Sequence, residues 1–182
     1  QKPKPLAENL KLGDSMNVLI VDSDEKFQSK LASMIRSTSL PDKASSVRIT
    51  PSRSLRDAIE QVETQQFDVI LTDITLSDAS GFLVLEELIE YSNRCPIIVL
   101  SNLTNWSVII ESAQVGIQDF LIKKTLDAGQ LIRSMIYARE RSRLERKVKK
   151  AEGVYESLVN IMPLGLFRTD KEGTLTYVND NF

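Results

Sequence analysis

Short runs of apolar residues alternate along the chain with longer segments in which apolar residues recur at helical spacing. Apolar runs bounded by polar residues are typical of strands buried on both faces of a sheet. We expect strands at 16–21, 47–50, 67–71, 96–100 and 119–122. We expect helices at 25–37, 54–63, 81–91, 104–115 and from 126 onward. This alternation predicts an α/β fold with a five-stranded, doubly wound parallel sheet.

The last predicted helix continues past the end of the predicted sheet domain. From Leu144 to Met162 its apolar positions step alternately by four and three residues, which is the seam of a coiled coil. The seam consists of Leu144, Val148, Ala151, Tyr155, Leu158 and Met162. Gly153 weakens the pattern in its middle. We expect a helical linker at 138–158 that joins two copies of the chain as a homodimer.

After Met162 the apolar pattern changes from that of a helix to that of strands. Leu166–Thr169 and Thr174–Val178 are predicted strands, and Gly173 stands in the turn between them, where a positive φ angle is required. A lone hairpin is marginally stable. We therefore expect 159–182 to be the truncated first part of a second, α+β domain.

Composition and charge narrow the class of protein. With 42% hydrophobic residues the chain can bury a core, and its net charge of -2 indicates neither nucleic acid nor a membrane as partner. The basic run at 133–150 is interpreted as the solvated face of a helix. Residues 1–15 are interpreted as a flexible leader. The single cysteine, Cys95, allows no intrachain disulfide, which favours the cytoplasm.

The sequence contains no histidine, which removes several kinds of chemistry. Histidine-dependent nucleophiles and histidine-ligated zinc are excluded. A phosphohistidine within this chain is excluded as well.

Acidic residues, a hydroxyl and a lysine stand at the ends of the predicted strands. Asp22 and Asp24 follow the first strand, Asp73 the third, Ser101 the fourth and Lys123 the fifth. These ends share one edge of a parallel sheet, where doubly wound folds bind ligands. Carboxylates can hold Mg²⁺ or attack phosphorus, while a hydroxyl and an ammonium neutralise phosphoryl oxygens. Each residue alone could be a helix cap or a loop residue, but the combination predicts a phosphoryl-transfer site.

Four segments resemble, in order, the receiver domain of response regulators. VLIVDSD is similar to the opening acidic turn, ILTDITLSDASG to the phosphoacceptor segment, IIVLSN to the hydroxyl segment and GIQDFLIKK to the lysine segment. The resemblance covers 16–137. It implies a flavodoxin-like receiver fold, phosphorelay signalling, and a sensor histidine kinase or phosphotransfer protein as partner.

The resemblance also implies a role for each matching residue. Asp73 would accept the phosphoryl group, and Lys123 and Ser101 would contact its oxygens. Mg²⁺ would be held by Asp22, Asp73 and the backbone carbonyl of Thr75. As an enzyme, the receiver would catalyse only its own phosphorylation and dephosphorylation.

Two aromatic residues are further candidates. Phe120 matches the switch position that turns inward when the hydroxyl of Ser101 moves, which implies a surface change upon phosphorylation. Trp106 is a candidate for a partner surface, although it could equally pack against its own helix.

The sequence departs from the family pattern at one metal ligand. The family usually has two adjacent acidic residues after the first strand, but here Ser23 follows Asp22. A neutral hydroxyl weakens the metal site unless Asp24, as a further ligand, or Asp22 shifts to compensate. The alternative function is therefore a degenerate receiver that binds proteins or dimerises without being phosphorylated.

The rest of the chain resembles the connection to a further domain. LDAGQLIRSMIYARERSRLER is similar to the exit helix of receivers fused to other signalling domains, and SLVNIMPLGLFRTDKEGTLTYVNDNF to the beginning of a PAS sensor domain. Two other classes are disfavoured. A haloacid-dehalogenase-like phosphatase needs a second aspartate at position 75, where this sequence has Thr75. A nucleotide-binding flavodoxin-like protein needs a glycine-rich loop after the first strand, and this sequence has none there.

Overall fold

The computed structural model describes residues 15–38, 46–92, 95–102, 116–161, 163–179 and 181–182. The chain divides into two compact units, of which the first ends at Ser142 and the second comprises Arg143–Phe182. The predicted helix at 104–115, and Trp106 with it, lies outside the described residues. None of the described helices is both long enough and apolar enough to span a membrane.

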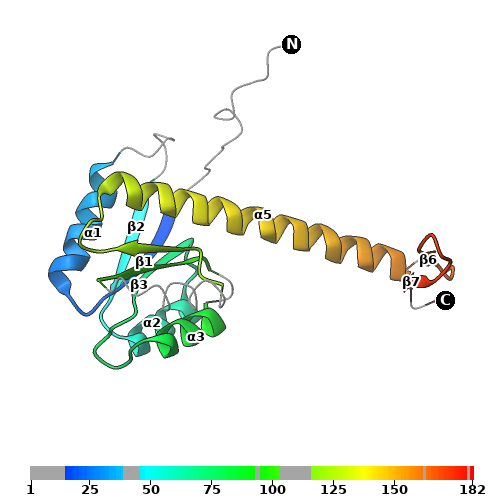
Figure 1. Ribbon diagram of the computed structural model, residues 1–182, viewed down its shortest axis with the longest axis horizontal. Coiled ribbons are helices and arrows are strands. Elements are labelled where there is room, and N and C mark those ends of the chain that lie inside the picture. The colour runs from blue at the N-terminus through cyan, green and yellow to red at the C-terminus, as the bar shows by residue number, and fades with distance from the viewer. Residues whose placement is uncertain (1–14, 39–45, 93–94, 103–115, 162, 180) are drawn as a thin grey trace, which may run out of the picture. The chain divides into compact units, whose positions relative to one another are not determined.

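Five parallel strands form the sheet of the first unit, in the order β2-β1-β3-β4-β5 (Figure 1). The strands are Met16–Val21 (β1), Val47–Ser52 (β2), Val69–Asp73 (β3), Ile97–Ser101 (β4) and Asp119–Ile122 (β5). This is the order of flavodoxin-like doubly wound folds, in which ligands bind where the winding reverses, between β1 and β3. The predicted α/β class with its five-stranded parallel sheet is confirmed.

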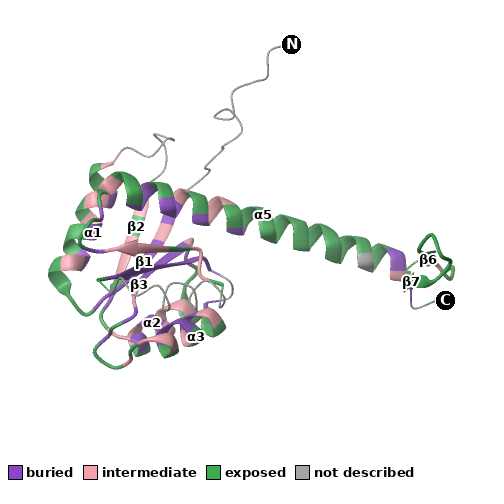
Figure 2. Cartoon of the chain, in the orientation of Figure 1, coloured by how far each residue is buried: buried purple, intermediate pink, exposed green. Residues whose placement is uncertain are grey.

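Helices cover both faces of this sheet (Figure 1). They are α1 (Glu25–Ser37), α2 (Leu55–Thr64), α3 (Phe82–Tyr91) and α5 (Ala128–Ile161). Alternate residues of the strands pack against α1 and the first turns of α5 in one cluster, and against α2 and α3 in another. The central strands are buried at all but one position each in β1 and β3, which Figure 2 shows mainly in purple, so the sheet is a rigid base for the loops at its edge.

Side-chain caps fix where the helices after β1 and β2 begin. The carboxylate of Asp24 accepts from the backbone N–H groups of Lys26 and Phe27, and the hydroxyl of Ser54 accepts from that of Asp57. Such caps satisfy N–H groups that have no partner within the helix. They place both helix starts directly beside the carboxyl edge of the sheet.

The second unit contains the C-terminal part of α5 and an antiparallel hairpin of β6 (Phe167–Thr169) and β7 (Leu175–Val178). Gly173 has a φ angle of 88° in the turn, as the sequence predicts. The buried amide of Asn179 donates to the carbonyls of Val159 and Leu164, both at 2.9 Å, and accepts from the N–H of Leu166. Asn179 thus ties the hairpin to the last turn of α5. The PAS-like character of this unit stays a prediction.

Candidate functional site

The carboxyl ends of four neighbouring strands bring the predicted site residues to one edge of the sheet. Asp22 follows β1 directly, Asp73 and Ser101 are the last residues of β3 and β4, and Lys123 follows β5. The strand register aligns these ends, because Val21 pairs with Thr72, Asp73 with Leu100 and Ser101 with Ile122. Residues that are far apart in the sequence therefore converge.

The ammonium group of Lys123 bridges two carboxylates at this edge. Its Nζ lies 2.5 Å from Oδ2 of Asp22 and is also ion-paired with Oδ2 of Asp73. The side chains of Lys123 and Asp22 are 8% and 3% exposed and that of Asp73 is 13% exposed, so water screens these charges little. An unpaired carboxylate is costly to bury, and the lysine offsets that cost for both acids.

Backbone hydrogen bonds orient the other oxygen of each carboxylate. Oδ1 of Asp22 accepts from the N–H of Asp24 at 2.8 Å, and Oδ1 of Asp73 accepts from the N–H of Thr75 at 2.9 Å. The N–H of Lys123 donates to the carbonyl of Ser101 at 2.9 Å. Both acids are thus held by their own loops, and the loop after β5 is held to the end of β4.

Two side chains of α1, Gln28 and Phe27, also support the site, although no motif in the sequence marks them. The buried amide of Gln28 donates to the carbonyls of Asp22 and Ser52, both at 2.6 Å, and joins the ends of β1 and β2. The ammonium of Lys123 lies 4.6 Å from the centre of the Phe27 ring, in cation–π contact. Their position in the first turn of the helix after β1 was the available signal.

Ser101 and Phe120, the predicted switch residues, lie on adjacent strands. Ser101 is buried, and Phe120 is half-buried against the cluster of Ile74, Leu85 and Val99. The register pairs Phe120 with Val99, two residues before Ser101. Their roles in switching stay predictions.

Asp22, Asp73 and Thr75 match the ligand chemistry of Mg²⁺. This ion is commonly bound by one or two carboxylates, with oxygen ligands and water completing the shell. Asp22 and Asp73 provide two carboxylates within reach of one cation, and the carbonyl of Thr75 belongs to the adjacent loop. Asp24 is exposed and caps α1 with its carboxylate, so its role as a ligand stays a prediction. Among the described residues, no group of three acids is clustered for metal binding.

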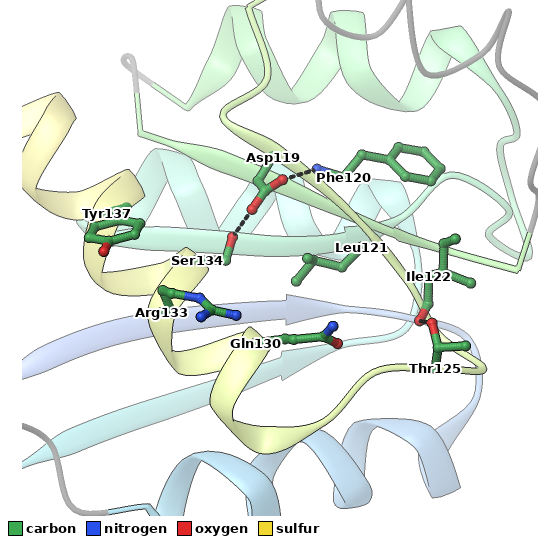
Figure 3. A pocket seen from close by; sticks show the side chains of 9 residues that line it. All are labelled: Asp119, Phe120, Leu121, Ile122, Thr125, Gln130, Arg133, Ser134 and Tyr137. Carbon is green, nitrogen blue, oxygen red and sulfur yellow. Dashed lines mark hydrogen bonds between the residues drawn. The ribbon is translucent and has the colours of Figure 1, made fainter.

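A separate cavity of about 320 Å³ lies along β5 and the first turns of α5 (Figure 3). Phe120, Gln130, Arg133 and Tyr137 contribute to its lining, and Asp119 is hydrogen-bonded to the hydroxyl of Ser134 at 2.5 Å. The lining does not include Asp22, Asp73 or Lys123. The cavity is therefore distinct from the cluster of paired charges.

A doubly wound sheet with a lysine bridging two strand-end aspartates is the arrangement of a receiver-type fold. The sequence model of the response regulator receiver domain matches residues 18–136. The chain therefore belongs to the response regulator receiver domain family and to two-component signalling. The resemblance found in the sequence is confirmed for this part, whereas no comparison shows the PAS fusion.

Curated relatives resemble the chain over this region. The transcriptional regulatory protein ZraR of Escherichia coli K12 is 26% identical over 110 residues, which are 60% of this chain and 23% of that protein. The Regulator of RpoS of the same strain is 26% identical over 121 residues, which are 66% of this chain and 34% of that protein. The chain thus spans about a third or less of the length of these relatives.

Solved structures show the same fold. A CheY-like receiver domain protein from Methanospirillum hungatei JF-1 has a TM-score of 0.60 at 18% identity and covers 71% of this chain and 98% of its own. The beryllofluoride-activated NtrC4 receiver domain dimer has a TM-score of 0.60 at 21% identity, over 69% and 98% respectively. Identities this low establish the fold alone.

Proposed function

We propose that this receiver accepts a phosphoryl group on Asp73 from the phosphohistidine of a sensor histidine kinase or phosphotransfer protein. The observation that carries the proposal is the buried bridge from Lys123 to both Asp22 and Asp73. A structural ion pair would need only one acid. A second acid at the same cation provides the oxygen ligands and the negative charge that a metal-assisted phosphoryl transfer requires.

In the proposed reaction a carboxylate oxygen of Asp73 attacks phosphorus. The P–N bond of the donor breaks, and the imidazole nitrogen leaves with the bonding electrons. Lys123 neutralises the phosphoryl oxygens, and Ser101 hydrogen-bonds to one of them after transfer. Mg²⁺, when bound by Asp22, Asp73 and the carbonyl of Thr75, supplies positive charge to the same oxygens.

The signal is proposed to leave the receiver through α5. A change at Ser101 and Phe120 would alter the surface next to α5, which continues to Ile161 as one helix. Its apolar positions at Leu144, Val148 and Leu158 are exposed, which suits pairing with a second copy. The hairpin after the helix would begin a PAS-like domain, and the protein would act in the cytoplasm.

A phosphoryl-group analogue, beryllofluoride, and a small-molecule phosphoryl donor, acetyl phosphate, test the proposal. Purified protein with MgCl2 and beryllofluoride is expected to show chemical shift changes around Asp73, and acetyl phosphate to add one phosphoryl group by mass spectrometry. Asp73→Asn should abolish both responses, and Asp68→Asn is the matched control outside the site. Lack of modification of the wild type would favour the degenerate receiver, for which the neutral Ser23 is the specific argument.

A further inference from the structure

The hydroxyl of Ser23 connects three loops at the carboxyl edge of the sheet. It donates to the carbonyl of Arg53 at 3.0 Å and accepts from the backbone N–H of Ser77 at 2.9 Å. These three residues belong to the loops after β1, β2 and β3. One side chain therefore holds together loops that are 30 and 54 residues away from it in the sequence.

The next residue of the third loop makes a second connection. The carboxylate of Asp78 accepts from the N–H groups of Leu55 and Arg56, at 2.8 and 3.0 Å, and so caps α2 from a neighbouring loop. The hydroxyl of Ser77 also reaches the carbonyl of Arg53, at 3.5 Å. Ser77 and Asp78 together anchor the loop after β3 to the loop and helix that follow β2.

This anchored loop carries the backbone of Thr75. A bridge between Thr75 and Ser80 and a hydrogen bond from the N–H of Gly81 to the carbonyl of Ile74 close the loop on itself. A closed loop moves as one body, so a contact at Ser77 constrains the position of Thr75. The N–H of Thr75 in turn orients the carboxylate of Asp73 at 2.9 Å.

We propose that Ser23 is a positioning residue, whose hydroxyl fixes the loop after β3 so that Asp73 and the carbonyl of Thr75 are held ready to bind a cation. The proposal rests on the proposed function for its effect on metal binding, but not for its effect on the loop. A hydroxyl can donate to the carbonyl of Arg53 and accept from the N–H of Ser77 through a single oxygen atom. An aspartate at 23 would add charge but could not donate, and an alanine could do neither.

Ser23 is exposed, so its two hydrogen bonds compete with water and their loss changes global stability little. The effect is local, because opening of a loop requires only the free energy of its own contacts. Ser23→Ala removes both bonds without changing charge. Ser23→Thr keeps the hydroxyl, and Ser33→Ala is a matched control that removes a hydroxyl from the exposed face of α1.

Amide hydrogen exchange, measured by NMR without metal or phosphate donor, tests the loop directly. Ser23→Ala should speed exchange at Ser77 by about three- to tenfold, the range expected for a hydrogen bond of ordinary net strength. Ser23→Thr and Ser33→Ala should leave this rate near the wild-type value. Unchanged exchange at Ser77 in Ser23→Ala would overturn the proposal.

Titration of the same variants with MgCl2, followed by NMR chemical shifts, tests the consequence for the site. Ser23→Ala should weaken Mg²⁺ binding by about three- to tenfold although no charge is lost, and Ser23→Thr should restore it. Faster exchange with unchanged Mg²⁺ affinity would also overturn the positioning role. If the wild type binds no Mg²⁺, the proposed function fails, and the exchange measurement alone decides whether Ser23 holds the loop.

Discussion

Lys123 and Asp22 form a buried ion pair with Nζ and Oδ2 2.5 Å apart, although 101 residues separate them in the sequence. The contact joins the end of β5 to the end of β1. Lys123 also pairs with Asp73 at the end of β3, which lies between these two strands in the sheet. The bridge thus depends on the strand order. It also makes Lys123 the side chain whose loss should have the largest electrostatic effect.

Replacement of Lys123 by methionine should destabilise the receiver and make its stability depend more strongly on Mg²⁺ than that of the wild type. The substitution leaves a buried and a partly buried carboxylate without their cation, and breaking a buried ion pair typically costs about 3–5 kcal/mol. A divalent ion can neutralise both acids, so excess MgCl2 should restore part of the loss. Urea unfolding with and without MgCl2 measures both effects.

Lys124→Met provides the matched control for this prediction, because Lys124 is the exposed neighbour of Lys123. It should change the free energy of unfolding by less than about 0.5 kcal/mol, and its stability should respond to MgCl2 as that of the wild type does. Equal behaviour of the two variants would show that the bridge does not stabilise the fold.

Asp78 should make the loop after β3 sensitive to acid. Burial raises the pKa of Asp78, but hydrogen bonds from the backbone of Arg56, Leu55 and Asp78 itself, with the charge of Arg56, lower it to a net value below the usual 3.8. A folded-state pKa below the unfolded one means that the ionised carboxylate stabilises the fold above pH 3.8. This contribution is lost as the pH falls through the lower, folded-state pKa.

The difference in melting temperature between the wild type and Asp78→Asn should therefore be constant above the usual pKa of an aspartate and shrink in more acidic solution. Asp57→Asn is a control, because Asp57 lies on the helix that Asp78 caps. The substitution leaves the bonds from Asp78 to that helix intact. A difference that grows on acidification would contradict the predicted sign.

The positions of Asp22, Asp73 and Lys123 could be predicted because apolar runs mark the buried strands and the site residues follow them directly. The bounds were less predictable, as β3 shows. The apolar run begins at Phe67, but the strand is Val69–Asp73. The residues that pair with β1 and β4 begin at Val69 and extend to the polar Asp73. The apolar pattern in the sequence marks the residues that are buried, whereas the bounds of the strand are set by its hydrogen bonds to neighbouring strands.

Loop contacts were beyond the sequence pattern. Ser23 stood out as a neutral residue in an acidic position, but its partners Arg53 and Ser77 lie in other loops and follow no period. The cap that Asp78 provides to α2 follows no sequence pattern either, because Asp78 lies in another loop and Ser54 already caps this helix locally. Such contacts arise only when the folded sheet brings its loops together.

Gly165 should be essential for the second unit and irrelevant to the first. A Cβ atom at Gly165 would lie 2.9 Å from the carbonyl oxygen of Asn181 and from Cα of Phe182, both backbone atoms that cannot move aside cheaply. Gly165→Ala should therefore disturb the hairpin, seen as lost NMR signals of β6 and β7. Beryllofluoride-induced shifts around Asp73 should be unchanged, and a loss of those shifts would contradict the prediction.

The exposed seam in the second unit predicts that the protein dimerises through α5. Leu144, Val148, Tyr155 and Leu158 are each 58–62% exposed and recur at coiled-coil spacing. If a second copy covers them, Leu158→Lys should raise the dimer dissociation constant by about tenfold or more, because a buried leucine contributes about 1.5–3 kcal/mol.

Gly153→Ala should act in the opposite direction. Glycine within a helix costs about 1 kcal/mol relative to alanine, and an added Cβ at Gly153 meets no atom within 4 Å. A better helix lowers the ordering cost of pairing, so this variant should dimerise more tightly than the wild type. Sedimentation equilibrium of the wild type, Leu158→Lys and Gly153→Ala ranks their dimer dissociation constants. Lys149→Gln, which lies outside the seam, is the neutral control. Dimers of equal strength in all four would place the interface away from α5.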